Sequence, residues 1–180
     1  MGRSIFIIRH GEKPPPGHGV EEDGTQDKHS LVPLGWQRAG ALATFFAGPR
    51  ASLAQPTVLI APQYAKHGKR ERTHETIAPL AALLGLEVTS PFGKGEEAKL
   101  GADLAAATAG VTLVCWEHTH LPAIAESIPK PAGTQIPTSW PAERFDVVWV
   151  FERDAQAGLY EFSQVPQMLL HGDLDTPIGA

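Results

Sequence analysis

The stretch "SIFIIRHGEK", residues 4–13, decides the fold because an apolar run ends abruptly in polar residues. Its first part, "SIFII" (4–8), is rich in β-branched and aromatic side chains, which is typical of a strand inside a buried sheet. Arg9, His10 and Gly11 follow directly. In parallel α/β sheets, ligands bind outside the carboxyl ends of the strands. We therefore expect Arg9 and His10 to lie at a binding site.

The composition is that of one compact domain, residues 1–180, with enough apolar material (42% hydrophobic) for a core. The net charge of −5 and the lack of a Lys/Arg run argue against a nucleic-acid partner. The apolar start is too short for a membrane span or a signal peptide. The single Cys115 excludes an internal disulfide framework and fits a cytoplasmic location. No sequence feature indicates an oligomeric state.

Beyond the first strand, strands and helices alternate. Further strands are predicted at 57–61, 86–90, 111–116, 145–152 and 159–165, and helices at 34–48, 72–85, 95–110 and 121–128. This alternation predicts an α/β fold, a three-layer α/β/α sandwich with a mainly parallel central sheet. Pro79 should break or kink its helix unless it lies near the first turn. The Pro- and Gly-rich segments 13–33 and 129–141 are expected to be loops that determine substrate specificity.

His10 is the first candidate for chemistry. A neutral imidazole can attack phosphorus and hold the phosphoryl group covalently. Arg9 offers planar donors that match phosphate oxygens, and Gly11 allows the backbone to approach a ligand closely. Alternatively, Arg9 makes a surface ion pair and His10 binds a carbonyl group.

The second candidate is His118, in "CWEHTH" (115–120). It follows the strand 111–116 as His10 follows the first strand, so the two imidazoles can converge on one cleft. His118 and His120 could instead bind a metal, since residues i and i+2 of an extended segment face the same side. However, no third ligand with recognisable spacing follows, and we favour phosphate over metal. His120 is expected at the rim.

The third candidate is the cationic segment "KRERTHET" (69–76). Arg70 and Arg72 lead into a helix, and a helix N-terminus favours anions. For Lys69 and Arg70 we favour a solvated charge cluster.

Four motifs in order, "RHGE" (9–12), "LVPLGWQRAGALA" (31–43), "RTHETIAPLA" (72–81) and "VTLVCWEH" (111–118), resemble the histidine phosphatase superfamily. The resemblance is to the branch that contains phosphoglycerate mutases and small phosphohistidine phosphatases, and it covers roughly residues 3–125. It implies a phosphoglycerate mutase-like fold and a reaction that needs no metal and no cofactor.

Residue by residue, the resemblance implies that His10 is the phospho-accepting nucleophile. Arg9, Arg72 and His118 would bind the phosphoryl group. Gly35 matches a glycine at a helix start, where its role would be structural.

The chain departs from the family pattern in three places. Ala61-Pro62 stands where Ser-Pro is usual, and an insertion follows, so the choice of Arg72 over Arg70 depends on the register. Glu117 stands before the second histidine, where Gly is usual. Some family members have a glutamate after the third strand as the general acid, and the resemblance implies Glu96 for this role; the other candidates are Glu97, Glu117 and Glu12. Glu96 and Glu97 could instead be carboxylates that favour a helix start.

The resemblance therefore implies a metal-independent phosphatase that hydrolyses a phosphomonoester or a phosphohistidine. Its partner would be a small phosphorylated substrate or a phosphoprotein. One alternative is a phosphoglycerate mutase-like phosphotransferase, which needs a well-closed pocket. We disfavour it because 180 residues leave less chain for a lid than mutases usually carry. Another is a non-catalytic phosphate-binding module.

Overall fold

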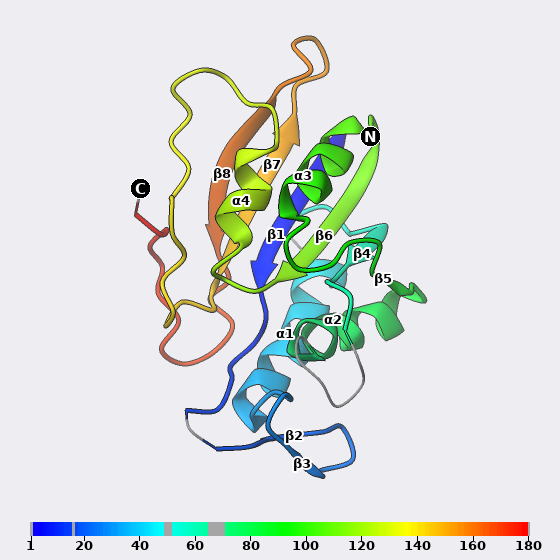
Figure 1. The fold of residues 1–180 in the computed structure, drawn as a ribbon, viewed down its shortest axis with the longest axis vertical. Helices are drawn as coiled ribbons and strands as arrows, with labels where there is room; N and C mark the ends of the chain where they lie inside the picture. The colour runs from blue at the N-terminus through cyan, green and yellow to red at the C-terminus, as the bar shows by residue number, and fades with distance from the viewer. Residues whose placement is uncertain (1, 16, 49–51, 65–70, 180) are drawn as a thin grey trace.

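A mixed six-stranded sheet forms the centre of the computed structural model, which describes residues 2–15, 17–48, 52–64 and 71–179 (Figure 1). In spatial order the strands are β5 (Val88–Thr89), β4 (Val58–Ile60), β6 (Gly110–Trp116), β1 (Arg3–Arg9), β7 (Val147–Arg153) and β8 (Tyr160–Pro166). The strands from β5 to β1 are parallel, whereas β7 is antiparallel to β1 and β8 is antiparallel to β7. The expected α/β fold with a mostly parallel sheet is thus confirmed.

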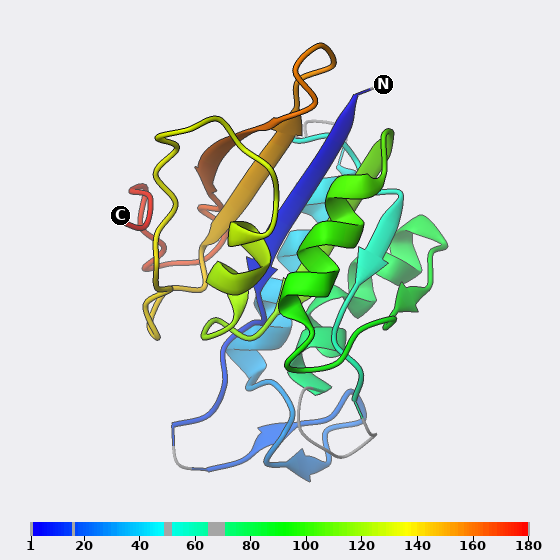
Figure 2. The same ribbon diagram turned by 45° about the horizontal axis from the view of Figure 1, so that its top comes forward.

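Helices lie on both faces of this sheet (Figure 2). The helices α1 (Pro33–Ala47) and α2 (Glu71–Leu84) pack on one face, and α3 (Glu97–Ala106) and α4 (Leu121–Glu126) on the other. Successive side chains of a strand point to opposite faces. Accordingly, Phe6 and Ile8 pack with the first helix pair, and Ile5 and Ile7 with the second. Both faces of β1 are therefore buried, which explains its unbroken apolar run.

The neighbouring strands β1 and β6 define where a ligand could bind. They pair in parallel register, with Arg9 opposite Trp116. The helix that follows β1 covers one face, and the helix that follows β6 covers the other. Such a reversal leaves a crevice at the carboxyl ends of the two strands, the usual ligand site of an open α/β sheet.

Two details differ from the sequence expectation. The segment 13–33, expected to be a loop, contains a small antiparallel sheet of β2 (Gly19–Val20) and β3 (Gln26–Asp27). Pro79 lies in the interior of α2, yet the helix continues to Leu84. Its neighbours Ile77 and Leu80 are fully buried, and this packing stabilises the helix despite the missing backbone donor.

Within the described ranges, no helix is both long enough and apolar enough to cross a membrane.

Candidate functional site

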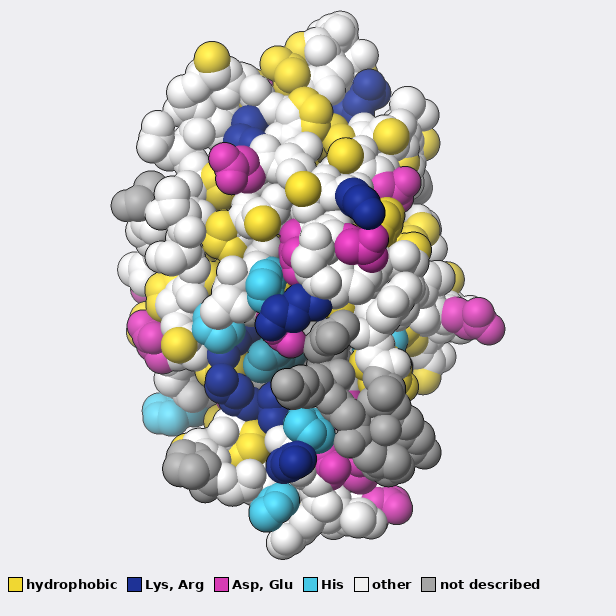
Figure 3. Space-filling view, in the orientation of Figure 1, with side chains coloured by type: hydrophobic (Ala, Val, Ile, Leu, Met, Phe, Trp, Pro, Cys, Tyr) yellow, Lys and Arg dark blue, Asp and Glu magenta, His cyan; other side chains and the backbone are white. Residues whose placement is uncertain are grey.

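A cavity of about 200 Å³ lies at the carboxyl ends of β1 and β6. Its lining residues are His10, Lys13, Arg72, Thr73, Glu117, His118 and Thr119. On this face of the molecule, Lys, Arg and His side chains gather just beyond the ends of the two strands (Figure 3). The structure therefore brings three of the expected residues, from three distant segments, to one basic cavity suited to an anion.

His10 is buried, and its tautomer follows from one hydrogen bond. The distance between its Nδ1 and the carbonyl oxygen of Gly11 is 2.7 Å. A carbonyl oxygen can only accept, so Nδ1 carries the proton and Nε2 keeps its lone pair. Burial, and after it the charge of Arg9, lowers the pKa of His10 to about 3. His10 is therefore neutral near pH 7, which is the nucleophilic form.

A hydrogen-bond chain joins the His10 segment to α2. The Gly11 amide donates to Oγ1 of Thr76 at 2.8 Å, and that hydroxyl donates to the Arg72 carbonyl at 2.6 Å. The same segment packs tightly on α1, since a Cβ at Gly35 would lie 2.6 Å from the carbonyl oxygen of Glu12. Gly35 therefore has the structural role that the resemblance implied.

Arg72 projects from the first turn of α2 into the cavity lining. Two backbone carbonyls fix its guanidinium: Nε donates to Ser30 at 3.1 Å, and Nη2 donates to Lys28 at 2.5 Å. Burial lowers its pKa, although the nearby carboxylates oppose this shift. Lys69 and Arg70 lie outside the described residues, so the choice between the two arginines stays a prediction.

Arg9 is fully buried and is not among the residues that line the cavity. Its Nη1 donates to the carbonyls of Ala142 (2.5 Å) and Arg144 (3.1 Å), and its guanidinium stacks 3.8 Å from the ring centroid of Phe145. Nε and Nη2 are buried and have no hydrogen-bond partner within the part of the chain that the structure describes. Arg9 thus provides a cation close to His10 with donor capacity to spare. Sequence reasoning missed the contacts from residues 142–145, because it gave these residues no role at the site.

His118 is the second imidazole that lines the cavity, together with His10, Lys13 and Arg72. Burial and the charges of Arg9 and Lys13 lower its pKa to about 4, whereas Glu117 acts in the opposite direction. His118 is therefore a second neutral imidazole near pH 7.

The four carboxylates considered as general acid occupy different environments. Glu96 is half-buried and accepts hydrogen bonds from the Gly93 amide and from Lys99, both at 3.0 Å. Glu12 pairs with Arg38 at 2.7 Å. Glu97 is buried and accepts a hydrogen bond from Nε1 of Trp116. Of the four, all within described ranges, Glu117 alone lines the cavity.

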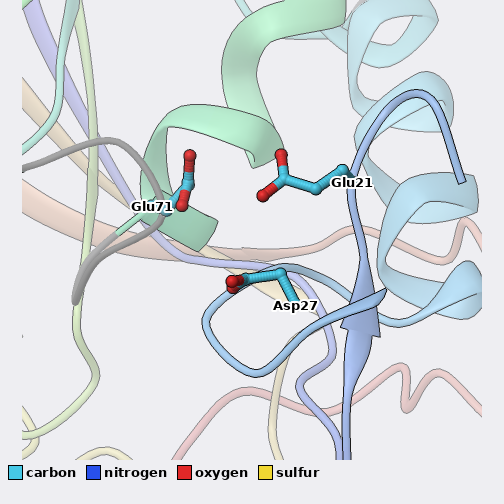
Figure 4. A group of neighbouring side chains, drawn as sticks. All are labelled: Glu21, Asp27 and Glu71. Carbon is cyan, nitrogen blue, oxygen red and sulfur yellow. The ribbon is translucent and has the colours of Figure 1, made fainter. Parts of the chain in front are cut away.

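Carboxylates dominate a different region of the molecule. A larger cavity of about 380 Å³ is lined by several acidic side chains and would repel phosphate. Two of its lining residues, Glu21 and Glu71, lie close to Asp27, and among the described residues these three carboxylates form the one set of three potential metal ligands (Figure 4). His118 and His120 are not members of that set, and no member of it lines the basic cavity.

No protein-family model and no curated protein matches this chain. Function is therefore inferred from the chemistry of the basic cavity and from the sequence motifs.

Proposed function

We propose that the chain is a metal-independent phosphatase of the histidine phosphatase superfamily with a phosphoglycerate mutase-like fold. It would hydrolyse a phosphomonoester or a phosphohistidine through a covalent phosphohistidine on His10. One observation carries the proposal: a buried imidazole with Nδ1 protonated shares a small basic cavity with Arg72 and His118. The substrate would be a small phosphorylated molecule or a phosphoprotein.

The first step is transfer of the phosphoryl group to His10. Nε2 attacks phosphorus in line, and the bond from phosphorus to the leaving oxygen or nitrogen breaks with its electron pair. The leaving atom takes a proton from a carboxylic acid, and the imidazole ring of His10 carries one positive charge. Arg72 and His118 line the cavity and stabilise the charge on the equatorial oxygens, and the buried Arg9 adds its positive charge close to His10. Such charge stabilisation is the main requirement of phosphoryl transfer.

The second step returns the enzyme to its starting state. Water attacks phosphorus and loses one proton to the carboxylate formed in the first step. The bond between phosphorus and Nε2 breaks, so phosphate leaves and His10 is neutral again. The two steps together consume one water molecule and leave the acid protonated.

Turnover of p-nitrophenyl phosphate by the purified protein, with and without EDTA, tests this proposal. Hydrolysis unaffected by EDTA supports the phosphatase. Phosphate binding without turnover supports the non-catalytic module instead. Transfer of the phosphoryl group between two bound metabolites, with slow release to water, supports the mutase-like alternative.

A further inference from the structure

His120, expected only at the rim, lies between two carboxylates. Its Nδ1 is 3.4 Å from Oε1 of Glu97, and its Nε2 is 3.9 Å from Oε2 of Glu117. The His120 side chain is 27% exposed, so protons can exchange with solvent. When both ring nitrogens of His120 are protonated, its positive charge forms an ion pair with each of the two carboxylates.

Glu97 is the buried end of this arrangement. Nε1 of Trp116 donates to its Oε1 at 3.2 Å, and the Gly95 amide donates to its Oε2 at 2.9 Å. Burial raises the pKa of Glu97, but these hydrogen bonds and the charge of His120 outweigh burial, so the net shift is downward. Glu97 therefore stays ionised and fixed.

Glu117 is the cavity end. It follows directly after Trp116 of β6 and lines the basic cavity next to His118. The His120 amide donates to the Glu117 carbonyl at 3.0 Å, which closes a tight turn and keeps the two side chains together. Lys94 contacts Oε2 of Glu117 at 3.4 Å from outside the cavity.

We propose that Glu97, His120 and Glu117 form a proton-transfer chain that ends at the phosphate cavity. This inference rests on the proposed function. Glu117 is the catalytic residue that gives a proton to the leaving atom as its bond to phosphorus breaks. Before each phosphoryl transfer, His120 with both ring nitrogens protonated gives one proton to Glu117, and Glu97 is a positioning residue that holds His120.

The chain works in reverse during hydrolysis of the phosphohistidine. Glu117 accepts a proton from the attacking water and passes it back to His120. Because 3.9 Å is too long for a direct hydrogen bond, the transfer between His120 and Glu117 takes place through one bridging water or after a small rotation of either side chain.

The test compares two substrates that differ in how much they need an acid. An alkyl phosphate has a poor leaving group and needs protonation, whereas p-nitrophenyl phosphate has a good one. Glu117→Gln keeps the shape but cannot donate a proton. It should lower kcat/KM for the alkyl phosphate by about 10²- to 10⁴-fold and for p-nitrophenyl phosphate by about tenfold or less. His120→Gln should also lower kcat/KM more for the alkyl phosphate than for p-nitrophenyl phosphate, but by less than Glu117→Gln does. Glu97→Gln should show the same difference between the two substrates with the smallest loss of the three.

Glu126→Gln, at an exposed position of α4, is the matched control and should leave both values unchanged. Equal losses on both substrates in Glu117→Gln, or a selective alkyl loss only in Glu96→Gln, would overturn the proton-transfer chain while leaving the phosphatase intact. If the wild type hydrolyses neither substrate, both the proposed function and this inference are wrong. Unchanged vanadate binding by Glu117→Gln would show that the variant folds and retains the cavity.

Discussion

The backbone N–H of His10 donates a hydrogen bond to the carbonyl of Trp116, 3.2 Å away. This bond is the last link between β1 and β6, and both chains leave the sheet immediately after it. The two chain segments that carry the imidazoles of the candidate site, His10 and His118, therefore leave the sheet from the same hydrogen-bonded position. This shared hydrogen bond makes the floor of the proposed phosphate cavity rigid, as preorganised charge stabilisation requires.

Vanadate should bind this cavity and stabilise the protein. The positive charges of Arg9 and Arg72 lie close together beside two neutral imidazoles, so a bound anion relieves the repulsion between the two guanidinium groups. Binding to the native state alone stabilises it by roughly 2.7 kcal/mol at a ligand concentration of one hundred times Kd. A thermal melt with and without vanadate should therefore show a higher Tm for the wild type and a much smaller shift for Arg9→Ala. Equal shifts in both proteins would contradict a contribution of the Arg9 charge to anion binding.

Arg72→Ala should lower kcat/KM for p-nitrophenyl phosphate by a factor of order 10²–10³, as expected for the loss of one preorganised charge donor. Arg72 lines the cavity and is fixed by two backbone carbonyls. Arg70→Ala is the comparison and should change kcat/KM little. The opposite ranking in steady-state kinetics would mean that the motif register through the insertion is wrong.

Gly35→Ala should destabilise the fold by about 1–3 kcal/mol, since the added Cβ would overlap the Glu12 carbonyl at 2.6 Å and force α1 away from the site. Gly40 in the same helix provides the control, because nothing lies within 4 Å of a Cβ there. Gly40→Ala should stabilise by roughly 0.5–1 kcal/mol through helix propensity. Urea unfolding measures both values. A neutral Gly35→Ala variant would contradict the close packing.

Stability should depend on pH through His10. Its pKa falls from the ordinary 6.5 to about 3 on folding, mainly because of burial. Between these values the unfolded chain binds more protons than the native one, so this contribution to stability is complete above pH 6.5 and is lost as pH falls. From pH 7 to pH 5, the wild type should lose about 2 kcal/mol more than His10→Gln.

A second buried group, Glu75, makes the comparison between the wild type and His10→Gln necessary. Burial raises its pKa to about 7, so its contribution increases as pH falls over part of the same range and masks His10 in the wild type alone. The difference between wild type and His10→Gln cancels Glu75. The unfolding experiment needs a buffer free of phosphate and sulfate, because anions bind the native state. Parallel pH curves for the two proteins would show that His10 titrates normally.

The core of the site was predictable because its signals are local. Two apolar runs define two strands, one ending just before Arg9 and His10 and the other just before Glu117 and His118. If these strands are parallel neighbours, their ends must lie side by side. For the two imidazoles, adjacent residues in the sequence were enough. Arg72 was expected from the register of the family motif, and the choice between Arg72 and Arg70 stays a prediction.

What could not be predicted depends on contacts between distant segments. The residues that hold Arg9 come from 142–145, more than a hundred positions away. Likewise, Oε1 of Glu97 at the start of α3 lies near both His120 and Nε1 of Trp116 in β6, although these residues are about twenty positions further along the chain. The sequence left four carboxylates as candidates for the acid, Glu96 first among them, because spacing alone does not show that Glu117 is the one that lines the cavity.

The most direct test of the central claim is to trap the phosphoryl group on His10. Wild-type protein incubated with p-nitrophenyl phosphate, quenched rapidly without acid and digested, should yield a peptide with an acid-labile phosphate on His10 by mass spectrometry. His10→Ala should lose the modification and turnover with an unchanged circular dichroism spectrum, whereas His171→Ala, at an exposed position, should keep both. Substantial turnover by His10→Ala, or a phosphate on another residue, would contradict the mechanism.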